Sequence, residues 1–202
     1  MGGRWEEIGK LQFDFLVAQG LEPEHFLLDV GCGSLRGGVH FIRYLRSGHY
    51  FGVDINREIL DAGRFELEKN DLAHKTVTLV QSGEFDFDAL GRSFDYALAQ
   101  SLFTHLPLNS IVVCLMRLEG VLNKGGKFFA TFLENPEGKR RLEPRAHPKV
   151  RDMELVTYFD KDPYHYDFAT FEWICEGTSL SVERIGGWGH PRDQMIMVFT
   201  KS

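Results

Sequence analysis

The sequence predicts an α/β fold in which a mostly parallel, seven-stranded sheet lies between two layers of helices. From residue 26 to residue 132, short apolar or β-branched runs alternate with segments of helical periodicity. Such alternation is typical of right-handed βαβ crossovers and of a parallel sheet. Two further strand-like runs, 180–185 and 195–201, follow each other directly and predict an antiparallel hairpin at the C-terminus.

Length and composition favour one globular domain. A single core can serve 202 residues, and 43% hydrophobic with 26% charged residues is ordinary for such a domain. Cys32, Cys114 and Cys175 are far apart, without C-x-x-C spacing, which indicates free thiols in a reducing compartment. The sequence has no signal-like leader and no apolar run of about 20 residues. We therefore expect a cytoplasmic protein that does not bind membranes, and the net charge of −6 argues against nucleic acid as a partner.

The first twenty residues predict a helix that precedes the first strand. Trp5, Ile8 and Leu16 recur at helical spacing, and Gly20 is a typical C-terminal stop. Trp5 either anchors this helix or caps a pocket, since Gly9 allows the helix to approach its neighbours closely. We expect a capping helix over residues 1–20.

The other elements follow from the same periodicities, and the region 134–168 stands apart as an irregular insertion. Its six basic residues form a solvated loop, a lid for an acidic substrate or a small nucleic-acid patch, although no aromatic residue is interleaved to stack a base. These residues are Lys139, Arg140, Arg141, Arg145, Lys149 and Arg151. The strands are expected at 26–30, 49–54, 76–80, 94–99 and 127–132, and the helices at 39–45, 57–70, 111–122 and 168–176.

A glycine loop lies where the first strand ends. Asp29 closes the apolar run, and Gly31 and Gly33 follow it with one residue between them. Asp54 ends the second strand, beside the first turn in an open α/β sheet, where a carboxylate accepts hydrogen bonds from a ribose diol. Residues 29–34 are therefore predicted to cradle an adenosine-containing ligand. Arg36 makes the pattern G-x-G-x-x-R, which argues against the dinucleotide fingerprint of a nicotinamide-dependent oxidoreductase, the alternative reading.

The composite resembles the class I S-adenosylmethionine-dependent methyltransferases, which have a Rossmann-like fold. The matching stretches cover nearly the whole chain and are Leu-Asp-Val-Gly-Cys-Gly-Ser at 28–34, Gly-Val-Asp-Ile at 52–55, Ser-Gly-Glu-Phe at 82–85, Phe-Asp-Tyr-Ala at 94–97 and Leu-Asn-Lys-Gly-Gly-Lys at 122–127. The resemblance implies one methyltransferase domain over 1–202 with S-adenosyl-L-methionine as its cofactor. It implies no metal.

The resemblance also assigns cofactor-binding residues. The glycine loop would face the methionine part of the cofactor, and the Gln100 backbone would contact the methionine amine. Asp54 would hold the ribose. Ile55 and Phe85 would lie against the adenine ring, and Glu84, or Gly83 in its place, would contact the adenine amino group. One departure is Leu35, which stands where the family often has a third glycine and implies a differently shaped loop. The full cofactor set is Asp29, Gly31, Cys32, Gly33, Ser34, Asp54, Ile55, Glu84, Phe85 and Gln100.

The acceptor is less well defined. Gln-Ser-Leu-Phe follows the fourth strand in place of the family's N/D-P-P-Y motif, and no Pro-Cys nucleophile is present. Both features argue against methylation of a nucleobase, so we expect transfer to an oxygen or nitrogen of a small molecule. A non-catalytic protein that binds the cofactor remains a further alternative.

Loops after parallel strands emerge at the carboxyl edge, where ligands bind, so polar residues of the last third are candidates for the substrate side. Each has a structural alternative, as a packed or solvated residue. We expect His165, Tyr166 and His190 to position the acceptor or act as bases, and Tyr164, Trp188 and Arg192 to bind the substrate, with Arg192 anchoring an anionic group.

Overall fold

The computed structural model describes residues 4–135, 142–147 and 155–202. The helices are α1 Trp5–Ala18, α2 Gly38–Tyr44, α3 Arg57–Lys69, α4 Leu108–Val121 and α5 Phe168–Cys175, with a short 3₁₀ turn, η1, at Phe87–Leu90. The strands are β1 Leu27–Val30, β2 Tyr50–Asp54, β3 Thr78–Gln81, β4 Phe94–Ala99, β5 Leu122–Phe132, β6 Arg145–Ala146, β7 Val156–Thr157, β8 Leu180–Gly187 and β9 Met195–Lys201.

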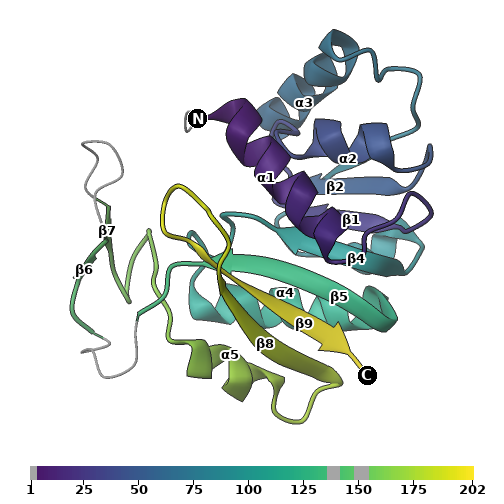
Figure 1. The fold of residues 1–202 in the computed structure, drawn as a ribbon. Helices are drawn as coiled ribbons and strands as arrows, with labels where there is room; N and C mark the ends of the chain where they lie inside the picture. Colours follow the sequence, from purple (N-terminus) through teal and green to yellow (C-terminus); the bar gives the residue numbers. More distant parts are fainter. Residues whose placement is uncertain (1–3, 136–141, 148–154) are drawn as a thin grey trace.

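Seven strands form one sheet in the order β3-β2-β1-β4-β5-β9-β8 (Figure 1). Strands β1 to β5 pair in parallel. Strand β9 is antiparallel to both neighbours, β5 and β8, so β8 runs in the same direction as β5. The predicted mostly parallel seven-stranded sheet with a C-terminal antiparallel hairpin is confirmed.

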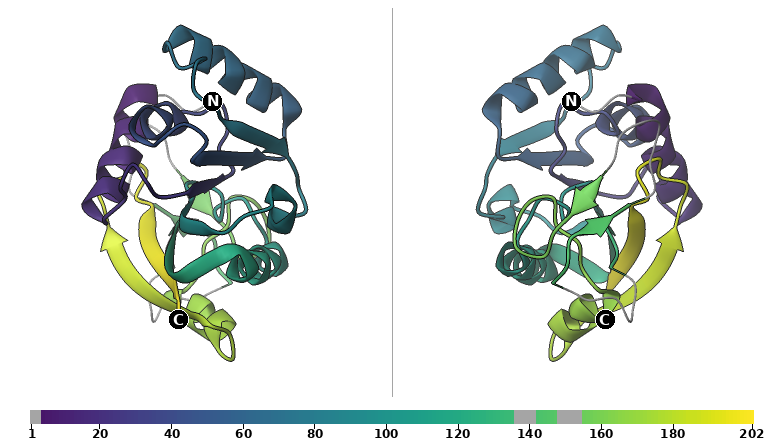
Figure 2. Two further views of the ribbon diagram at one scale, coloured as in Figure 1. Left: turned by 90° about the vertical axis from the view of Figure 1, so that its right-hand side faces the viewer. Right: turned by 90° about the vertical axis from the view of Figure 1, so that its left-hand side faces the viewer.

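Both faces of the sheet are covered by helices (Figures 1 and 2). Adjacent strand residues point to opposite faces. Leu27 and Phe129 pack in the cluster that includes the apolar sides of α1, α2 and α3, whereas their neighbours Leu28 and Phe128 pack with η1, α4 and α5. Because both faces are buried, the central strands are continuous apolar runs, as in other parallel sheets.

The starts of α4 and β5 differ from the sequence-based expectation. Helix α4 begins at Leu108, because Pro107 precedes it with an extended backbone. Strand β5 begins at Leu122, where the sequence predicted a loop around Gly125, and the register with β4 shifts there. The pairing therefore passes through an irregularity that the sequence pattern concealed.

The region 134–168 contains a small antiparallel ribbon, β6 with β7, that the sequence did not predict. It extends from the edge of the sheet near the loop that joins β8 to β9 (Figure 1). Of the six basic residues, Arg145 lies on β6 and the other five lie outside the described residues. Within the described ranges, no helix has the length and apolar content needed to cross a membrane.

Candidate active site

The loop after β1 is shaped by left-handed backbone positions. Gly31 has φ +74° and Gly33 has φ +56°, and glycine adopts such angles without steric cost. The N–H groups of Gly31 and Cys32 both donate to the carbonyl of Val53, at 2.8 and 3.1 Å. A Cβ at Gly31 would lie 3.2 Å from Leu102 Cδ1. These contacts hold a shallow cradle of backbone at the carboxyl end of β1.

Leu35 also has a left-handed backbone, with φ +66°, a conformation that is sterically unfavourable for leucine. Its side chain is fully buried among α2 and α3. Two glycines leave the space: a Cβ on Gly38 would lie 2.8 Å from Leu35 Cδ2, and one on Gly63 would lie 3.0 Å from Leu35 Cγ. The expected change of loop shape is therefore limited, because burial holds Leu35 in the conformation that glycine favours.

A cavity of about 190 Å³ lies between this loop, the start of the segment after β4 and helix α1. Cys32 forms part of its wall, and burial raises the pKa of its thiol, so the thiol stays protonated. The residues lining the cavity are Trp5, Gln12, Asp29, Gly31, Cys32, Gly33, Ser34, Arg36, Gly37, Ile59, Gln100, Ser101 and Arg192.

Asp29 is a buried carboxylate in this wall, with 4% of its surface exposed. Its pKa is raised to about 7, mainly by burial; the charge of Asp54 contributes to the rise, and the Tyr50 hydrogen bond and the charge of Arg36 oppose it. The Tyr50 hydroxyl donates to Asp29 Oδ2 at 2.6 Å. A carboxylate whose charge is poorly solvated binds a cationic group well, because a nearby positive charge favours the ionised form.

Asp54 lies at the end of β2 and joins it to the glycine loop. Its Oδ2 accepts from the Gly33 N–H at 3.0 Å, and its Oδ1 accepts from the Asn56 N–H at 2.9 Å. Asn56 in turn caps α3 by accepting from the Glu58 N–H at 2.9 Å. A carboxylate has about four acceptor positions, so both oxygens keep a lone pair for a diol.

A second surface lies at the ends of β2 and β3, outside the cavity lining. Ile55 is 70% exposed there, and a Cβ on Gly83 would lie only 2.9 Å from Ile55 Cδ1. Glu84 is exposed beside it, while Phe85 packs against Phe87 with ring centroids 6.0 Å apart. Of the two residues considered for the adenine amino contact, Gly83 is the one that lies against Ile55.

Gln100 connects the three segments that meet at the cavity. Its Oε1 accepts from Arg36 Nη2 at 3.0 Å, and its Nε2 donates to Ser101 Oγ at 2.6 Å. The same Nε2 lies 3.1 Å from His190 Nε2. The sequence indicated a backbone role for Gln100, whereas its side chain is the centre of a buried polar network.

His190 is buried beside Gln100, where it stacks on Trp188 with ring centroids 5.5 Å apart. The pKa of His190 is lowered to about 4, mainly by burial and also by the charges of Arg192 and Arg36. The ring is therefore neutral at physiological pH. Of the substrate-side candidates, Arg192 lines the cavity, and His190 and Trp188 lie in the loop that carries it.

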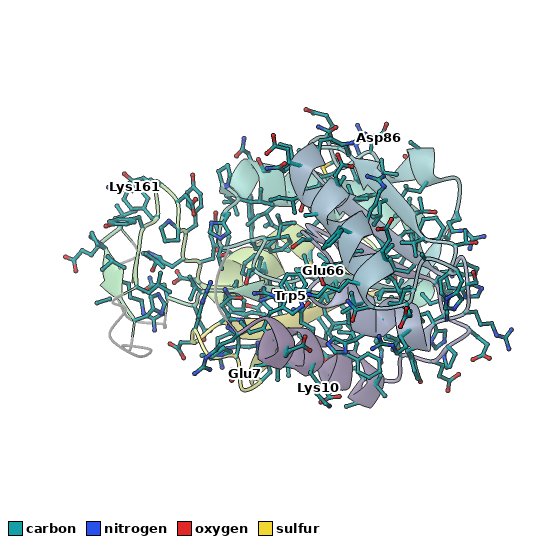
Figure 3. The ribbon with its side chains drawn as sticks, turned by 90° about the horizontal axis from the view of Figure 1, so that it is seen from above. Trp5, Glu7, Lys10, Glu66, Asp86 and Lys161 are labelled. Carbon is teal, nitrogen blue, oxygen red and sulfur yellow. The ribbon has the colours of Figure 1, made fainter. Side chains whose placement is uncertain are left out.

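Helix α1 forms one wall, through Trp5, which the sequence offered as a cap over a pocket, and Gln12, which sequence reasoning did not assign. Trp5 and Gln12 line the cavity, and Figure 3 shows Trp5 on the end of α1 and Lys161 on the far arm of the molecule. A Cβ on Gly9 would lie 2.3 Å from the Arg36 carbonyl oxygen, so the helix touches the loop backbone. Gln12 is a buried amide on the apolar stripe of α1, a position that could have marked it as functional.

Three other candidates lie in a different cluster. The Tyr166 hydroxyl donates to the Leu106 carbonyl at 2.6 Å, and burial raises the pKa of the phenol. Tyr164 stacks on Tyr166, and His165 Nδ1 lies 2.9 Å from the Thr157 hydroxyl. The structure does not bring Tyr164, His165 and Tyr166 into the cavity lining with Arg192.

A family model described as a methyltransferase domain matches residues 28–128, half of the chain. The chain belongs to this methyltransferase family. The resemblance to class I S-adenosylmethionine-dependent methyltransferases is thereby confirmed, and this methyltransferase's cofactor is S-adenosylmethionine. The match covers β1 to β4 and the start of β5, the part that holds the glycine loop and Asp54.

Solved structures of methyltransferases share the fold. The CcbJ methyltransferase from Streptomyces caelestis superimposes with a TM-score of 0.73 at 15% identity, over 100% of this chain and 97% of that one. The magnesium protoporphyrin IX methyltransferase from Synechocystis PCC 6803, solved with bound S-adenosylmethionine, gives 0.69 at 15% identity, over 100% and 86%. A putative rRNA methylase from Clostridium thermocellum gives 0.66 at 12% identity, over 96% and 94%.

Proposed function

We propose that this methyltransferase transfers a methyl group to an oxygen or nitrogen of a small-molecule acceptor. The observation that carries the proposal is the cavity itself, which is lined by Asp29 and the glycine loop, by Arg192 and by residues of α1. A concave cavity of about 190 Å³ suits a small molecule better than a folded nucleic acid. We also propose that residues 1–202 act as one domain in the cytoplasm, which the free cysteines favour.

The residues present fit the cofactor. We propose that Asp29 and the backbone of Gly31 and Gly33 face the methionine part, since an under-solvated carboxylate favours a cationic neighbour. Asp54 would accept from the ribose hydroxyls with its remaining lone pairs. Ile55, with Gly83 against it, would bind the adenine ring, and Glu84 and Phe85 would close that end.

S-adenosylmethionine, when bound, supplies a methyl group already activated by the positive sulfonium. The chain's part is then to hold the acceptor atom in line and to exclude water. We propose that His190 positions the acceptor through the Gln100 network, because a ring with a pKa of about 4 is a weak base at neutral pH. The roles of His165 and Tyr166 as bases would require a rearrangement that brings them to the cavity.

The small-molecule class is also supported by the neighbours. Solved structures with this fold include an amino pentose methyltransferase from Micromonospora echinaspora and a glycopeptide N-methyltransferase. An acceptor of nucleic acid is disfavoured by the net charge of −6. Family membership argues against the nicotinamide-dependent alternative, and turnover separates an enzyme from a protein that only binds the cofactor.

The proposal is tested in two steps on the full-length protein. Titration calorimetry should detect binding of S-adenosylmethionine and of its demethylated product, and no binding of NAD. A panel of metabolites is then incubated with cofactor labelled in the methyl group, and at least one small molecule should become labelled. Binding of NAD alone would exclude the proposal, and labelling of RNA with no labelled small molecule would exclude the acceptor class.

A further inference from the structure

Two guanidinium groups from different parts of the chain face the same cavity. Arg36 comes from the loop after β1, and Arg192 comes from the loop between β8 and β9. Burial lowers the pKa of Arg36, and the charge of Arg192 lowers it further, so the two groups are close enough to repel each other. Both also lower the pKa of His190, which lies beside them.

These two charges are not neutralised locally. Among the residues that the structure describes, neither arginine has an acidic partner within ion-pair distance. Arg36 donates a hydrogen bond to the neutral amide of Gln100. The carboxylate that favours the charged form of Arg36 is the more distant Asp29, which accepts a hydrogen bond from Tyr50. Two like charges in a partly buried site are unfavourable unless an anion joins them.

The loop that carries Arg192 is held in place. The Trp188 indole N–H donates to the Gln194 carbonyl at 3.0 Å, and the Asp193 N–H donates to the His190 carbonyl at 3.2 Å. Gln194 Oε1 accepts from the Ser101 hydroxyl at 3.0 Å, which ties the loop to the segment after β4. The backbone at Arg192 is thus fixed relative to the cavity, which lowers the entropy lost when its side chain binds a ligand.

We propose that Arg36 and Arg192 together bind an anionic group, a carboxylate or a phosphate, of the methyl acceptor. The inference rests on the proposed function. A guanidinium donates two parallel N–H bonds to either group, and a pair of them from two loops would fix both the position and the orientation of the acceptor. Among the residues that line the cavity, Asp29 carries the carboxylate, which we assign to the cofactor, and Arg36 and Arg192 carry the guanidinium groups that can bind an anion.

The anionic group could also come from a second source, the carboxylate of the cofactor's own methionine part. The two sources are separated by comparing the demethylated cofactor product with its decarboxylated analogue, which lacks that group. Calorimetry gives the affinity of each for the wild type, Arg36→Gln and Arg192→Gln. Inorganic phosphate is then titrated into each protein saturated with the demethylated product, as a probe for the acceptor site. Arg117→Gln, on the exposed side of α4, is the matched control.

We expect phosphate to bind the wild-type complex and the Arg117→Gln control, and to bind each of the other two variants at least tenfold more weakly. Their affinity for the demethylated product should change less than twofold. The inference would be overturned if the arginine variants bound the demethylated product tenfold more weakly than the wild type but bound the decarboxylated analogue equally well. That result would assign the arginines to the cofactor's carboxylate. Absence of phosphate binding to the wild-type complex would also overturn it. If Arg36→Gln fails to fold by circular dichroism, Arg192→Gln alone decides. Failure of the wild type to bind either cofactor form would contradict the proposed function instead.

Discussion

The segment from β1 to the start of β5 and the segment from β5 to the C-terminus contribute to one cavity in different ways. The first segment supplies the buried Asp29 and the backbone of Gly31 and Gly33, at the carboxyl end of β1 in the parallel part of the sheet. The second supplies Arg192 to the cavity lining, and from the same loop it supplies His190, which contacts the lining residue Gln100. Strand ends in a parallel sheet are fixed by the sheet, whereas a loop is placed by the contacts that its own side chains make.

The comparison indicates which part of the molecule is open to change. Backbone and strand-end carboxylates suit a ligand that does not vary, such as the cofactor. Side chains on a loop suit a ligand that varies from one methyltransferase to another, such as the acceptor. The family model ends at residue 128, within β5, so it matches the first segment and does not reach the loop that carries Arg192.

The largest effect is expected from Asp54→Ala in the first segment. The substitution removes the carboxylate and with it the two expected hydrogen bonds from the ribose, each worth about 1.5 to 3 kcal/mol for a charged acceptor. It also removes the hydrogen bond from the Gly33 N–H. Cofactor affinity should fall about a thousandfold while the circular dichroism spectrum stays unchanged. Asp61→Ala, on the exposed side of α3 and paired with Arg64, is the control and should bind normally. Equal affinity of the two variants would remove Asp54 from the site.

Asp29→Asn should change how stability depends on pH. Below pH 4 the carboxyl is protonated in both the folded and the unfolded chain. As the pH rises toward 7, the unfolded chain ionises first, because burial holds the folded pKa at about 7, so the wild type loses about 4 kcal/mol of its free energy of unfolding. Asparagine still accepts from Tyr50 and does not titrate.

Thermal melts at pH 5 and pH 8 measure this difference. The variant should be more stable than the wild type at pH 8 by more than it is at pH 5, and it should bind the cofactor more weakly at pH 8. A stability difference that is the same at both pH values would contradict the burial of an ionisable Asp29.

A smaller effect is expected where α1 meets the glycine loop. Gly9→Ala places a Cβ 2.3 Å from the Arg36 carbonyl, so the helix must shift, at a cost of about 1 to 3 kcal/mol. Gly120→Ala is a matched control within α4, because its Cβ would meet nothing closer than 3.8 Å. It should stabilise the protein by about 0.5 to 1 kcal/mol through helix propensity. Denaturant unfolding measures both, and a stabilising Gly9→Ala would show that α1 does not dock as described.

The smallest effect is expected in the second segment. His190→Ala should lower turnover about tenfold through the Gln100 network and change cofactor affinity less than twofold. Because the pKa of His190 is about 4, the pH profile of kcat/KM should keep its shape between pH 6 and pH 8. His165→Ala is the comparison: it should lower thermal stability, since His165 bonds to Thr157 outside the cavity. Loss of a titration limb near pH 6.5 in His190→Ala would instead make it the base.

The sequence predicted most of the fold because each strand carries its own pattern. The runs that end at Asp29 and Asp54 appear as β1 and β2, and their ends meet at one edge. Leu35 was harder to interpret, since its left-handed backbone depends on the space left by Gly38 and Gly63 in other elements. The β6–β7 ribbon gave no signal, because two-residue strands are too short to show a period.

The sequence by itself determined the α/β architecture, the glycine loop and the cofactor family, because these depend on local periodicity and on residues at strand ends. Only the tertiary structure decided that Trp5 and Gln12 of α1 line the cavity and that Gln100 links Arg36 to His190. It also decided that the guanidinium groups of Arg36 and Arg192 lie at the same cavity, where their charges interact. Arg36 and Arg192 are 156 positions apart in the chain. Their proximity comes from the packing of two loops at one sheet edge, which no local pattern records.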